Sequence, residues 1–400
     1  MCQRFDTHGC HEPVGRLPPD EFTCDSYGSG PAICLTMATS FADMGIDQYL
    51  RDRLMPVEGA IPHLRGIEMY GDSIPAESVG GDLFEYINFQ QRYDIDARIG
   101  NALKSSREFL KPNQPDAADC NSVDDHLEWL RSRSDYRIEL EAAYREVRSL
   151  ERVRVAENLG SLYDTAGVLL VDAQGHGVIS AKIASTVHDT FHAFMLCELD
   201  RYGTTTPDLF ESINLRLAQS VTARNALGSS GPGVAREIAT MLYGEVHPSG
   251  HFRFVNFGHP PPLLFSAHAR KFAEIDSERM VRFLPLGLEV PEDHPDRKRY
   301  TSLRFRQRPA HCSDVGDITL INPGDILFLY TDGVHDGGDE EERRELEELM
   351  HAHASLSAKE ICSAVLAYAV GKDQRLRESG QGDLVDDKTV FVIKRSDTES

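Results

Sequence analysis

The sequence lacks the features of a membrane or a secreted protein. No apolar run approaches the roughly 20 residues that a helix needs to cross a bilayer. The N-terminal stretch MCQRFDTHGC has no apolar segment of the kind found in secretory signals. Eight cysteines in 400 residues are too sparse for a disulfide scaffold. These absences predict a cytoplasmic protein with no membrane partner.

The chain is also short of positive charge. Lys and Arg number 42 against 64 Asp and Glu, which gives a formal net charge of −22. A protein that binds the phosphate backbone of nucleic acid needs the opposite balance, so nucleic acid is not an expected partner. An acidic chain can still hold multivalent cations, and metal sites therefore stay open.

Paired cysteine motifs are missing as well. Cys2, Cys10 and Cys24 have no C-x-x-C spacing, which does not favour a structural zinc site near the N-terminus.

Residues 1–40 are rich in Pro, Gly and polar groups, and we interpret them as a loose N-terminal leader. Residues 41–396 are expected to form the folded domain.

Residues 90–160 differ from their surroundings because they are dense in Arg, Glu and Asp. The loop sequence KPNQPDAADCNS divides them, so we predict a helical insertion of two helices. Apolar residues recur at helical intervals in the second half: Leu140, Tyr144, Val147 and Leu150. A helix must bury such a stripe against the core, its partner helix or a second subunit. A homodimer through the insertion is therefore one candidate arrangement, and a passive hairpin is the other.

Short apolar runs in the rest of the chain predict strands. LFEYINF, AGVLLV, GDILFLY and KTVFVIKR are such runs, and TMLYGEVHPSGHFRFVNF is typical of a hairpin with a Pro-Ser-Gly turn. Helical patterns such as SAKIASTVHDTFHAFML lie between them. Hairpin strands with flanking helices indicate an α/β (α+β) layered fold with largely antiparallel sheets.

Aspartates stand at the margins of four of these apolar runs. Asp82 begins LFEYINF, and Asp172 ends VLLV. Asp332 follows ILFLY, and Asp386 with Asp387 precedes TVFVIK. One Asp beside Gly is an ordinary turn residue, but several carboxylates at one sheet edge would repel each other unless a cation neutralised them. Oxygen donors with few His or Cys favour magnesium or manganese over zinc, so the pattern predicts a metal site.

The motifs around these aspartates resemble those of a known family. PAESVGGDLF, LLVDAQGHGV, FGHPPPLL, LPLG, NPGDILFLYTDGVHD and DDKTVFVI stand in the order found in bacterial metal-dependent Ser/Thr protein phosphatases. This is the protein phosphatase 2C-like superfamily, and the match is to its sporulation phosphatase E and sigma-factor-regulating branch. It spans roughly residues 45–395. The resemblance implies two mostly antiparallel β-sheets sandwiched between helices, and a site with two Mn²⁺ or Mg²⁺ ions.

The resemblance also implies roles for particular residues. It assigns the metal pair to Asp82, to Asp172 as the bridge, to the carbonyl of Ala173, and to Asp332 and Asp386, with Asp387 as the alternative to Asp386. His176 in the Asp-x-x-Gly-His-Gly element is a candidate general acid to the leaving serine oxygen, or else makes a structural hydrogen bond at a helix start. His259 in GHPPP is expected to anchor a loop.

Three features depart from the family pattern. Glu85 stands where this branch often has Asp, and IPAESVGGD offers no counterpart of the arginine that holds phosphate in eukaryotic members. Relatives join the two Asp elements by a short hairpin, whereas Asp172 follows Asp82 by 90 positions here. The helical insertion accounts for the excess.

The resemblance predicts an enzyme that hydrolyses phosphoserine or phosphothreonine on a regulatory protein by a metal-activated water. Within this branch the implied substrate is a phosphorylated anti-anti-sigma-like protein of a partner-switching pathway. Two alternatives stay open. One is a catalytically inactive module that binds a phosphoprotein, and the other is a different metallohydrolase, such as a phosphodiesterase.

Overall fold

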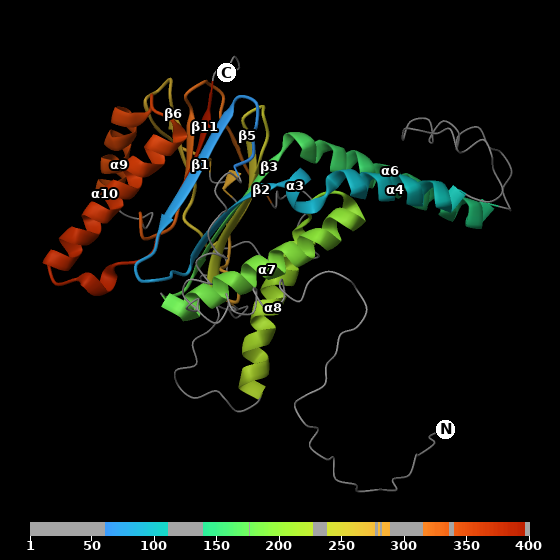
Figure 1. Ribbon diagram of the computed structural model, residues 1–400, viewed down its shortest axis with the longest axis horizontal. Coiled ribbons are helices and arrows are strands. Elements are labelled where there is room, and N and C mark those ends of the chain that lie inside the picture. Colours follow the sequence, from blue (N-terminus) through green and yellow to red (C-terminus); the bar gives the residue numbers. More distant parts are fainter. Residues whose placement is uncertain are drawn as a thin grey trace, which may run out of the picture. The chain divides into compact units, whose positions relative to one another are not determined.

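The computed structural model of the chain is shown in Figure 1. It describes residues 61–110, 139–175, 177–226, 238–276, 279–280, 282–288, 315–335 and 340–396. The N-terminal leader, the helical pattern expected after residue 41 and His176 lie outside the described residues.

Two β-sheets form the centre of the described chain (Figure 1). The first has the order β1-β11-β10-β6-β7, and all its pairs are antiparallel. Its strands are β1 (Ile67–Ile74), β6 (Leu263–Ser266), β7 (Lys271–Ala273), β10 (Ile326–Tyr330) and β11 (Lys388–Arg395).

The second sheet has the order β2-β3-β4-β5-β8, with β9 also paired to β5. Only β5 and β8 run parallel among its described pairs. Its strands are β2 (Asp82–Asn88), β3 (Ala166–Ala173), β4 (Ala239–Val246), β5 (His251–Phe257), β8 (Arg282–Phe283) and β9 (Gly316–Thr319).

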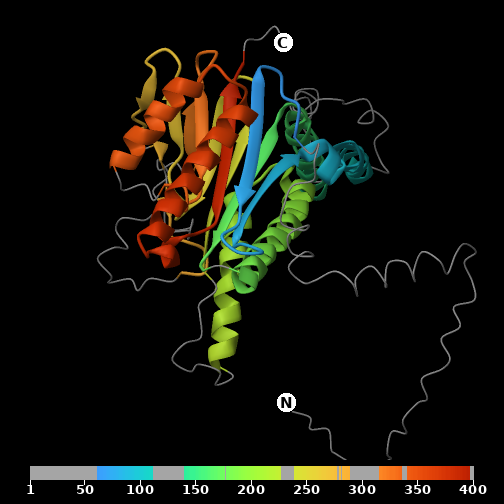
Figure 2. The same ribbon diagram turned by 60° about the vertical axis from the view of Figure 1, so that its left-hand side comes forward.

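Helices cover the outer faces of both sheets, as Figures 1 and 2 show. Helices α7 (Gly177–Tyr202) and α8 (Pro207–Ala226) lie on the β2–β8 sheet, and α9 (Glu340–His353) and α10 (Ala358–Glu378) lie on the other. Ser357 starts α10 with a capping box to Glu360, which satisfies backbone groups that the first turn leaves open. The predicted layered fold is confirmed.

Alternation along the strands sorts side chains between three cores. In β3, Val168 and Leu170 belong to the core between the sheets, whereas Leu169 and Val171 pack toward α7. Strands β3 and β10 are apolar on both faces because each face is covered, and this explains their continuous apolar runs in the sequence. Alternation also determines where polar side chains point. A polar residue at a strand end points to the same face of the sheet as the residue two positions away on that strand.

The inter-sheet core contains a cluster of aromatic rings. Phe391 of β11 is fully buried, with its ring centroid 6.2 Å from that of Phe84 and 5.0 Å from that of Tyr86. Gly71 of β1 is required beside them, because an added Cβ would lie 2.7 Å from the Phe391 ring and 2.9 Å from the Phe84 ring. These contacts hold the edge strand β2 against the opposite sheet.

The predicted insertion is helical in its described parts. It contains α3 (Phe89–Tyr93), α4 (Ile95–Leu110) and α6 (Glu139–Ser161), with η2 (Leu162–Asp164) before β3. Helices α4 and α6 lie side by side, and the Ser106 and Ser149 hydroxyls are 2.7 Å apart.

The predicted apolar stripe on α6 does not match the buried face of the helix from residue 145 onward, where the structure describes the side chains. Val147 is 52% exposed, whereas Glu146, Ser149, Val153 and Ala156 are buried. The buried face is displaced by one position because small and polar side chains allow close approach to α4. Leu159, further along, is fully buried in the core beneath α7.

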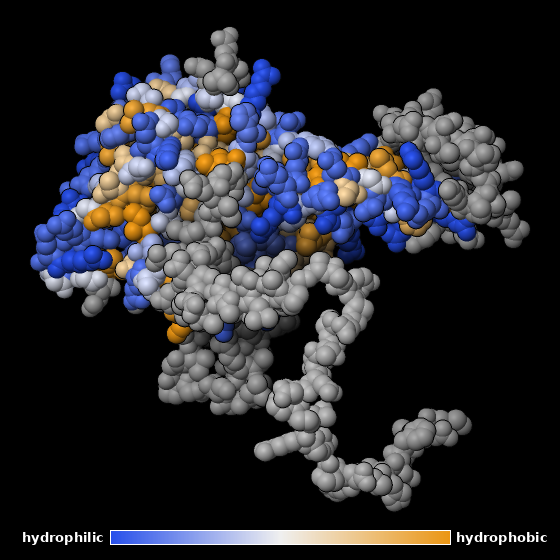
Figure 3. All heavy atoms as spheres, in the orientation of Figure 1, coloured by the Kyte–Doolittle hydropathy of each residue, from blue (hydrophilic) through white to orange (hydrophobic). Residues whose placement is uncertain are grey.

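The described surface is mostly hydrophilic in the view of Figure 3. Large exposed apolar side chains such as Ile179, Ile321 and Leu384 come from separate parts of the chain. No helix within the described ranges is long and apolar enough to cross a membrane.

Truncating Phe391 should destabilise the fold strongly. Phe391→Ala removes a buried ring between the sheets, and we expect it to lower the free energy of unfolding by about 3–5 kcal/mol. The matched change Val370→Ala, at a 42% exposed position of α10, should stay within about 0.5 kcal/mol. Urea unfolding followed by circular dichroism measures both. Equal stability of the two variants would contradict the assigned core.

Candidate metal centre

Asp82 and Asp172 face each other directly across β2 and β3. The antiparallel register pairs them, and Asp82 is 7% exposed. Asp82 shares the parity of Phe84 and Tyr86, and Asp172 shares that of Leu170, all of which face the inter-sheet core. The two carboxylates therefore lie together at one end of the space between the sheets.

The opposite sheet contributes two hydroxyls to Asp82. Thr331, directly after β10, and Thr389 of β11 both donate to Asp82 Oδ2, at 2.7 and 2.8 Å. The backbone N–H of Thr389 donates to Thr331 Oγ1 at 2.9 Å, which fixes the orientation of that hydroxyl. Neither threonine was predicted as a site residue, although each stands close to a predicted aspartate in the sequence.

The same two strand ends bring the remaining predicted aspartates to this site. Asp332 follows Thr331 and is exposed, whereas Asp386 is partly exposed just before β11. The carboxylates of Asp332, Asp386 and Asp387 all act electrostatically on Asp172. All five predicted aspartates are therefore gathered at one end of the sandwich.

Asp386 and Asp387 differ in their surroundings. Asp387 is 3% exposed, and its carboxylate accepts the backbone N–H of Ala76 at 2.7 Å and that of Gly81 at 2.6 Å. A Cβ on Gly80 would collide with this carboxyl group. Asp387 therefore holds the loop that carries the Gly-Gly-Asp element, whereas Asp386 accepts the backbone N–H of Asp387 at 2.8 Å.

Ala173 lies beside the same loop. Its N–H donates to the Gly81 carbonyl at 3.2 Å, and its own carbonyl oxygen would lie 2.6 Å from a Cβ on Gly81. Glycine at position 81 thus allows the Ala173 carbonyl to approach the start of β2, where Asp82 follows.

Burial and mutual repulsion raise the pKa values of the facing pair. Burial, and then the charge of Asp172, raise the pKa of Asp82 well above its usual range, although the Thr331 and Thr389 hydroxyls oppose this. Burial raises the pKa of Asp172 most, and the negative charges of Asp332, Asp386 and Asp387 raise it further, to about 8. Carboxylates so close need a cation to ionise together near neutral pH. An all-oxygen donor set fits magnesium or manganese.

Two further predicted residues have different outcomes. His259 is fully buried, its Nδ1 lies 2.8 Å from Thr240 Oγ1, and its carbonyl accepts from Asn256 at 3.0 Å. Burial lowers the pKa of His259 to about 3, so it is neutral. Its side-chain contact with Thr240 of β4 is of the kind expected for a loop anchor. Thr240 in turn lies opposite Asp172 on β4.

Glu85 does not join the aspartates. It has the parity of Leu83 and Ile87, which pack toward α7 on the other face of the sheet. Its carboxylate contacts His188 and His192 of that helix instead. The odd spacing between positions 82 and 85 was the available signal that the two carboxylates point to opposite faces.

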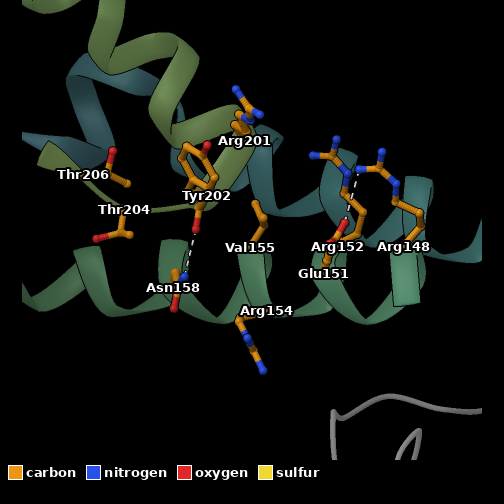
Figure 4. A pocket seen from close by; sticks show the side chains of 10 residues that line it. All are labelled: Arg148, Glu151, Arg152, Arg154, Val155, Asn158, Arg201, Tyr202, Thr204 and Thr206. Atoms are coloured by element: carbon orange, nitrogen blue, oxygen red, sulfur yellow. Dashed lines mark hydrogen bonds and ion pairs between the residues drawn. The ribbon is translucent and has the colours of Figure 1, made fainter. Parts of the chain in front are cut away.

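A cleft of about 680 Å³ lies away from the aspartates, between α6 and the end of α7 (Figure 4). Its lining includes four arginines, Arg148, Arg152, Arg154 and Arg201, and none of the aspartates described above. Arg152 donates to the Asp200 carbonyl and Asn158 to the Tyr202 carbonyl, both at 2.8 Å. These bonds connect the insertion to α7, and Arg154 points away from the other lining residues in Figure 4.

The described chain thus has two facing sheets with helices outside them, and its aspartates gather at one end of the space between the sheets. A family model described as Stage II sporulation protein E (SpoIIE) matches residues 163–306 and 316–396, more than half of the chain. The chain therefore belongs to the SpoIIE family. The matched residues include Asp172, Asp332 and Asp386, whereas Asp82 lies before them.

Comparison with solved structures gives distant similarities. The RsbU and RsbW domains of Rv1364c from Mycobacterium tuberculosis are 19% identical, with a TM-score of 0.43, over 85% of this chain and 64% of that one. The SiaA-PP2C domain of Pseudomonas aeruginosa is 14% identical, with a TM-score of 0.42, over 92% and 99% of the two chains. The chain thus spans less than two thirds of the Rv1364c structure. No curated protein matches the sequence.

The raised pKa values predict how the metal-free protein responds to pH. An unfolded Asp releases its proton near pH 4, whereas folded Asp172 keeps it up to about pH 8. The folded state therefore binds more protons in this window, and the stability gained is present at low pH and lost as pH rises to about 8.

Metal-free protein should accordingly melt at a lower temperature at pH 8 than at pH 5, measured by scanning calorimetry in chelator. Asp172→Asn should flatten this slope, and excess magnesium should do the same in the parent protein. A melting temperature that rises between pH 5 and 8 without metal would contradict the prediction.

Substitution should distinguish Asp387, which supports the fold, from Asp386, which is expected to bind metal. Asp387→Ala leaves two backbone N–H groups without their acceptor, and should cost about 1–3 kcal/mol of unfolding free energy. Asp386→Ala should change stability by less than about 0.5 kcal/mol, yet weaken manganese binding in calorimetric titration. The reverse pattern would assign the site role to Asp387.

Proposed function

We propose that this chain is a protein serine/threonine phosphatase that uses two Mg²⁺ or Mn²⁺ ions at the aspartate cluster. The observation that carries the proposal is the Asp82–Asp172 pair, opposed in register and oriented by threonines from the other sheet. The proposed ligands are Asp82, Asp172, the Ala173 carbonyl, Asp332 and Asp386. When bound, such ions make hydroxide available from water near neutral pH and offset charge on phosphoryl oxygens.

The protein residues position this chemistry. Thr331 and Thr389 both donate to Oδ2 of Asp82, so this carboxylate is held in one orientation. Asp387 fixes the preceding loop through two backbone N–H groups, which supports Asp386 as the ligand of the adjacent pair. A site held in place before substrate binds loses little free energy to rearrangement during the reaction.

His176 is the proposed proton donor to the leaving serine oxygen. It stands between Gly175 and Gly177, directly before α7 and four residues after Asp172. An ordinary imidazole titrates near pH ~6.5 and can supply a proton at neutral pH.

The proposed substrate is a phosphorylated anti-anti-sigma-like protein of a partner-switching pathway. Support comes from membership of the SpoIIE family. The two alternatives make different predictions. A binding module without activity would gain nothing from several clustered, mutually repelling carboxylates, and a phosphodiesterase would have to accept a diester.

We also retain a homodimer through the insertion as part of the proposal. Support comes from Val147, which is exposed on α6 although the adjacent face of the helix is buried against α4.

Activity should depend on metal and on Asp172. Purified protein should hydrolyse p-nitrophenyl phosphate with manganese or magnesium, and lose activity reversibly in excess chelator. Asp172→Asn should lower kcat at least about 10²-fold, the scale on which lost electrostatic stabilisation acts. Asp164→Asn, an exposed change in η2, is the matched control and should keep parental turnover.

Two comparisons separate the alternatives. Bis-p-nitrophenyl phosphate should be a far poorer substrate than the monoester, and a phosphoserine peptide should be hydrolysed. Full activity in metal-stripped protein would overturn the metal mechanism. Absence of activity with binding of phosphopeptide retained would favour the inactive module.

Oligomeric state tests the proposed dimer. Light scattering should give twice the monomer mass for the parent protein, and Val147→Glu should shift it toward monomer by placing a charge in the interface. Val370→Glu on α10 is the control and should not. A monomeric parent at micromolar concentration would contradict the dimer.

A further inference from the structure

A second cluster of metal-ligating side chains lies on the opposite face of the β2–β8 sheet. Oε2 of Glu85 is 3.0 Å from Nε2 of His188 and 2.6 Å from Nε2 of His192. All three ligand atoms lie within 4.8 Å of one another. The side chains are 12–14% exposed, so the cluster is largely enclosed but still reaches water.

Local structure explains why the three side chains meet. His188 and His192 are four residues apart on α7, which places them one turn apart on the same helix face. Their ring centroids are 4.5 Å apart. Glu85 meets them because its neighbours on β2, Leu83 and Ile87, also pack toward α7. The sequence HDTFH carries this spacing, and two histidines four apart on a helix are an established metal-ligand pattern.

The outer nitrogens of both histidines have polar neighbours. Nδ1 of His192 is 2.5 Å from the Tyr93 hydroxyl, and Nδ1 of His188 is 3.4 Å from an Asp189 carboxylate oxygen. Metal-bound histidines usually donate their second N–H to such a partner, which fixes the ring with its other nitrogen toward the ion. Arg92 lies 3.3 Å from Oε1 of Glu85, the oxygen that does not face the histidines.

Metals bind a carboxylate and the unprotonated nitrogen of an imidazole. The two Nε2 atoms that face Glu85 would therefore carry no proton in the metal-bound form, and zinc binding would release protons.

We propose that Glu85, His188 and His192 form a binding site for a borderline transition-metal cation such as Zn²⁺, separate from the aspartate site. Two nitrogens and one oxygen are a donor set that suits zinc rather than magnesium. With ligand bonds of about 2.0–2.1 Å, tetrahedral zinc needs donors roughly 3.3 Å apart. The two distances from Glu85 Oε2 to the histidine nitrogens, 3.0 and 2.6 Å, therefore have to lengthen by less than ~1 Å, and water would supply the fourth ligand.

The site is distinct in position as well as in chemistry. Glu85 is three residues from Asp82, about 10 Å along a strand, and points to the other face of the sheet. A bound cation would join β2 to α7, the helix that begins five residues after Asp172. The proposal does not rest on the proposed phosphatase activity, since a zinc site here would stand whether or not the chain hydrolyses phosphoesters.

Zinc binding to the full-length protein tests the site directly. Metal-stripped protein in excess magnesium, which occupies oxygen-donor sites, is titrated with Zn²⁺ in competition with a chromogenic chelator. We expect one tightly held zinc per chain and a rise in melting temperature. His188→Asn/His192→Asn should lose this zinc, or bind it at least about tenfold more weakly.

A matched control has two histidines with the same sequence spacing. His247→Asn/His251→Asn, around the β4–β5 turn, should bind zinc like the parent protein. Glu85→Gln, which keeps the side-chain shape, should also weaken zinc binding. X-ray absorption of zinc-loaded parent protein should show imidazole nitrogen and oxygen ligands, and this measurement decides the matter if the His188/His192 variant does not fold.

Three results would overturn the proposal. The first is a parent protein that holds no zinc in the presence of magnesium, which would make the cluster only a hydrogen-bonded contact between β2 and α7. The second is a His188/His192 variant that folds and keeps the parental zinc affinity. Sulfur ligands in the absorption spectrum would place the zinc on cysteines instead.

Discussion

The buried carboxylate of Asp82 connects the two halves of this protein. It belongs to one sheet, yet it accepts hydrogen bonds from Thr331 and Thr389 of the other. A buried carboxylate is costly unless hydrogen bonds or charges compensate it. These two bonds fix how the strand ends of the sheets meet, and the positions of Asp172, Asp332 and Asp386 follow from that arrangement.

Gathering these carboxylates in one place is energetically unfavourable, and this explains their raised pKa values. Several carboxylates share one partly enclosed space, and their repulsion with burial keeps the pKa of Asp172 near 8 without a cation. A cation bound at the proposed site would offset this repulsion, so its binding would be linked to folding.

Strand β2 carries a different acidic residue on each of its two faces. Asp82 points between the sheets, and Glu85 points to α7, where it meets His188 and His192. The insertion that follows β2 also contacts this helix, through Asn158 and Arg152. Helix α7 thus contacts both the insertion and β2, the strand that begins with Asp82.

The sequence by itself determined the layered fold, the helical insertion and the set of strand-end aspartates. Apolar runs and their polar margins are local, and the order of the motifs identified the family. Tertiary structure decided which face each side chain takes and which partner it meets. Asp387 holds a loop from more than 300 residues away, and Val147 is exposed because α4 packs on the neighbouring face of α6. Glu85 meets two histidines about 100 positions later. Such contacts depend on how sheets and helices pack, and periodicity within one segment carries no information about them.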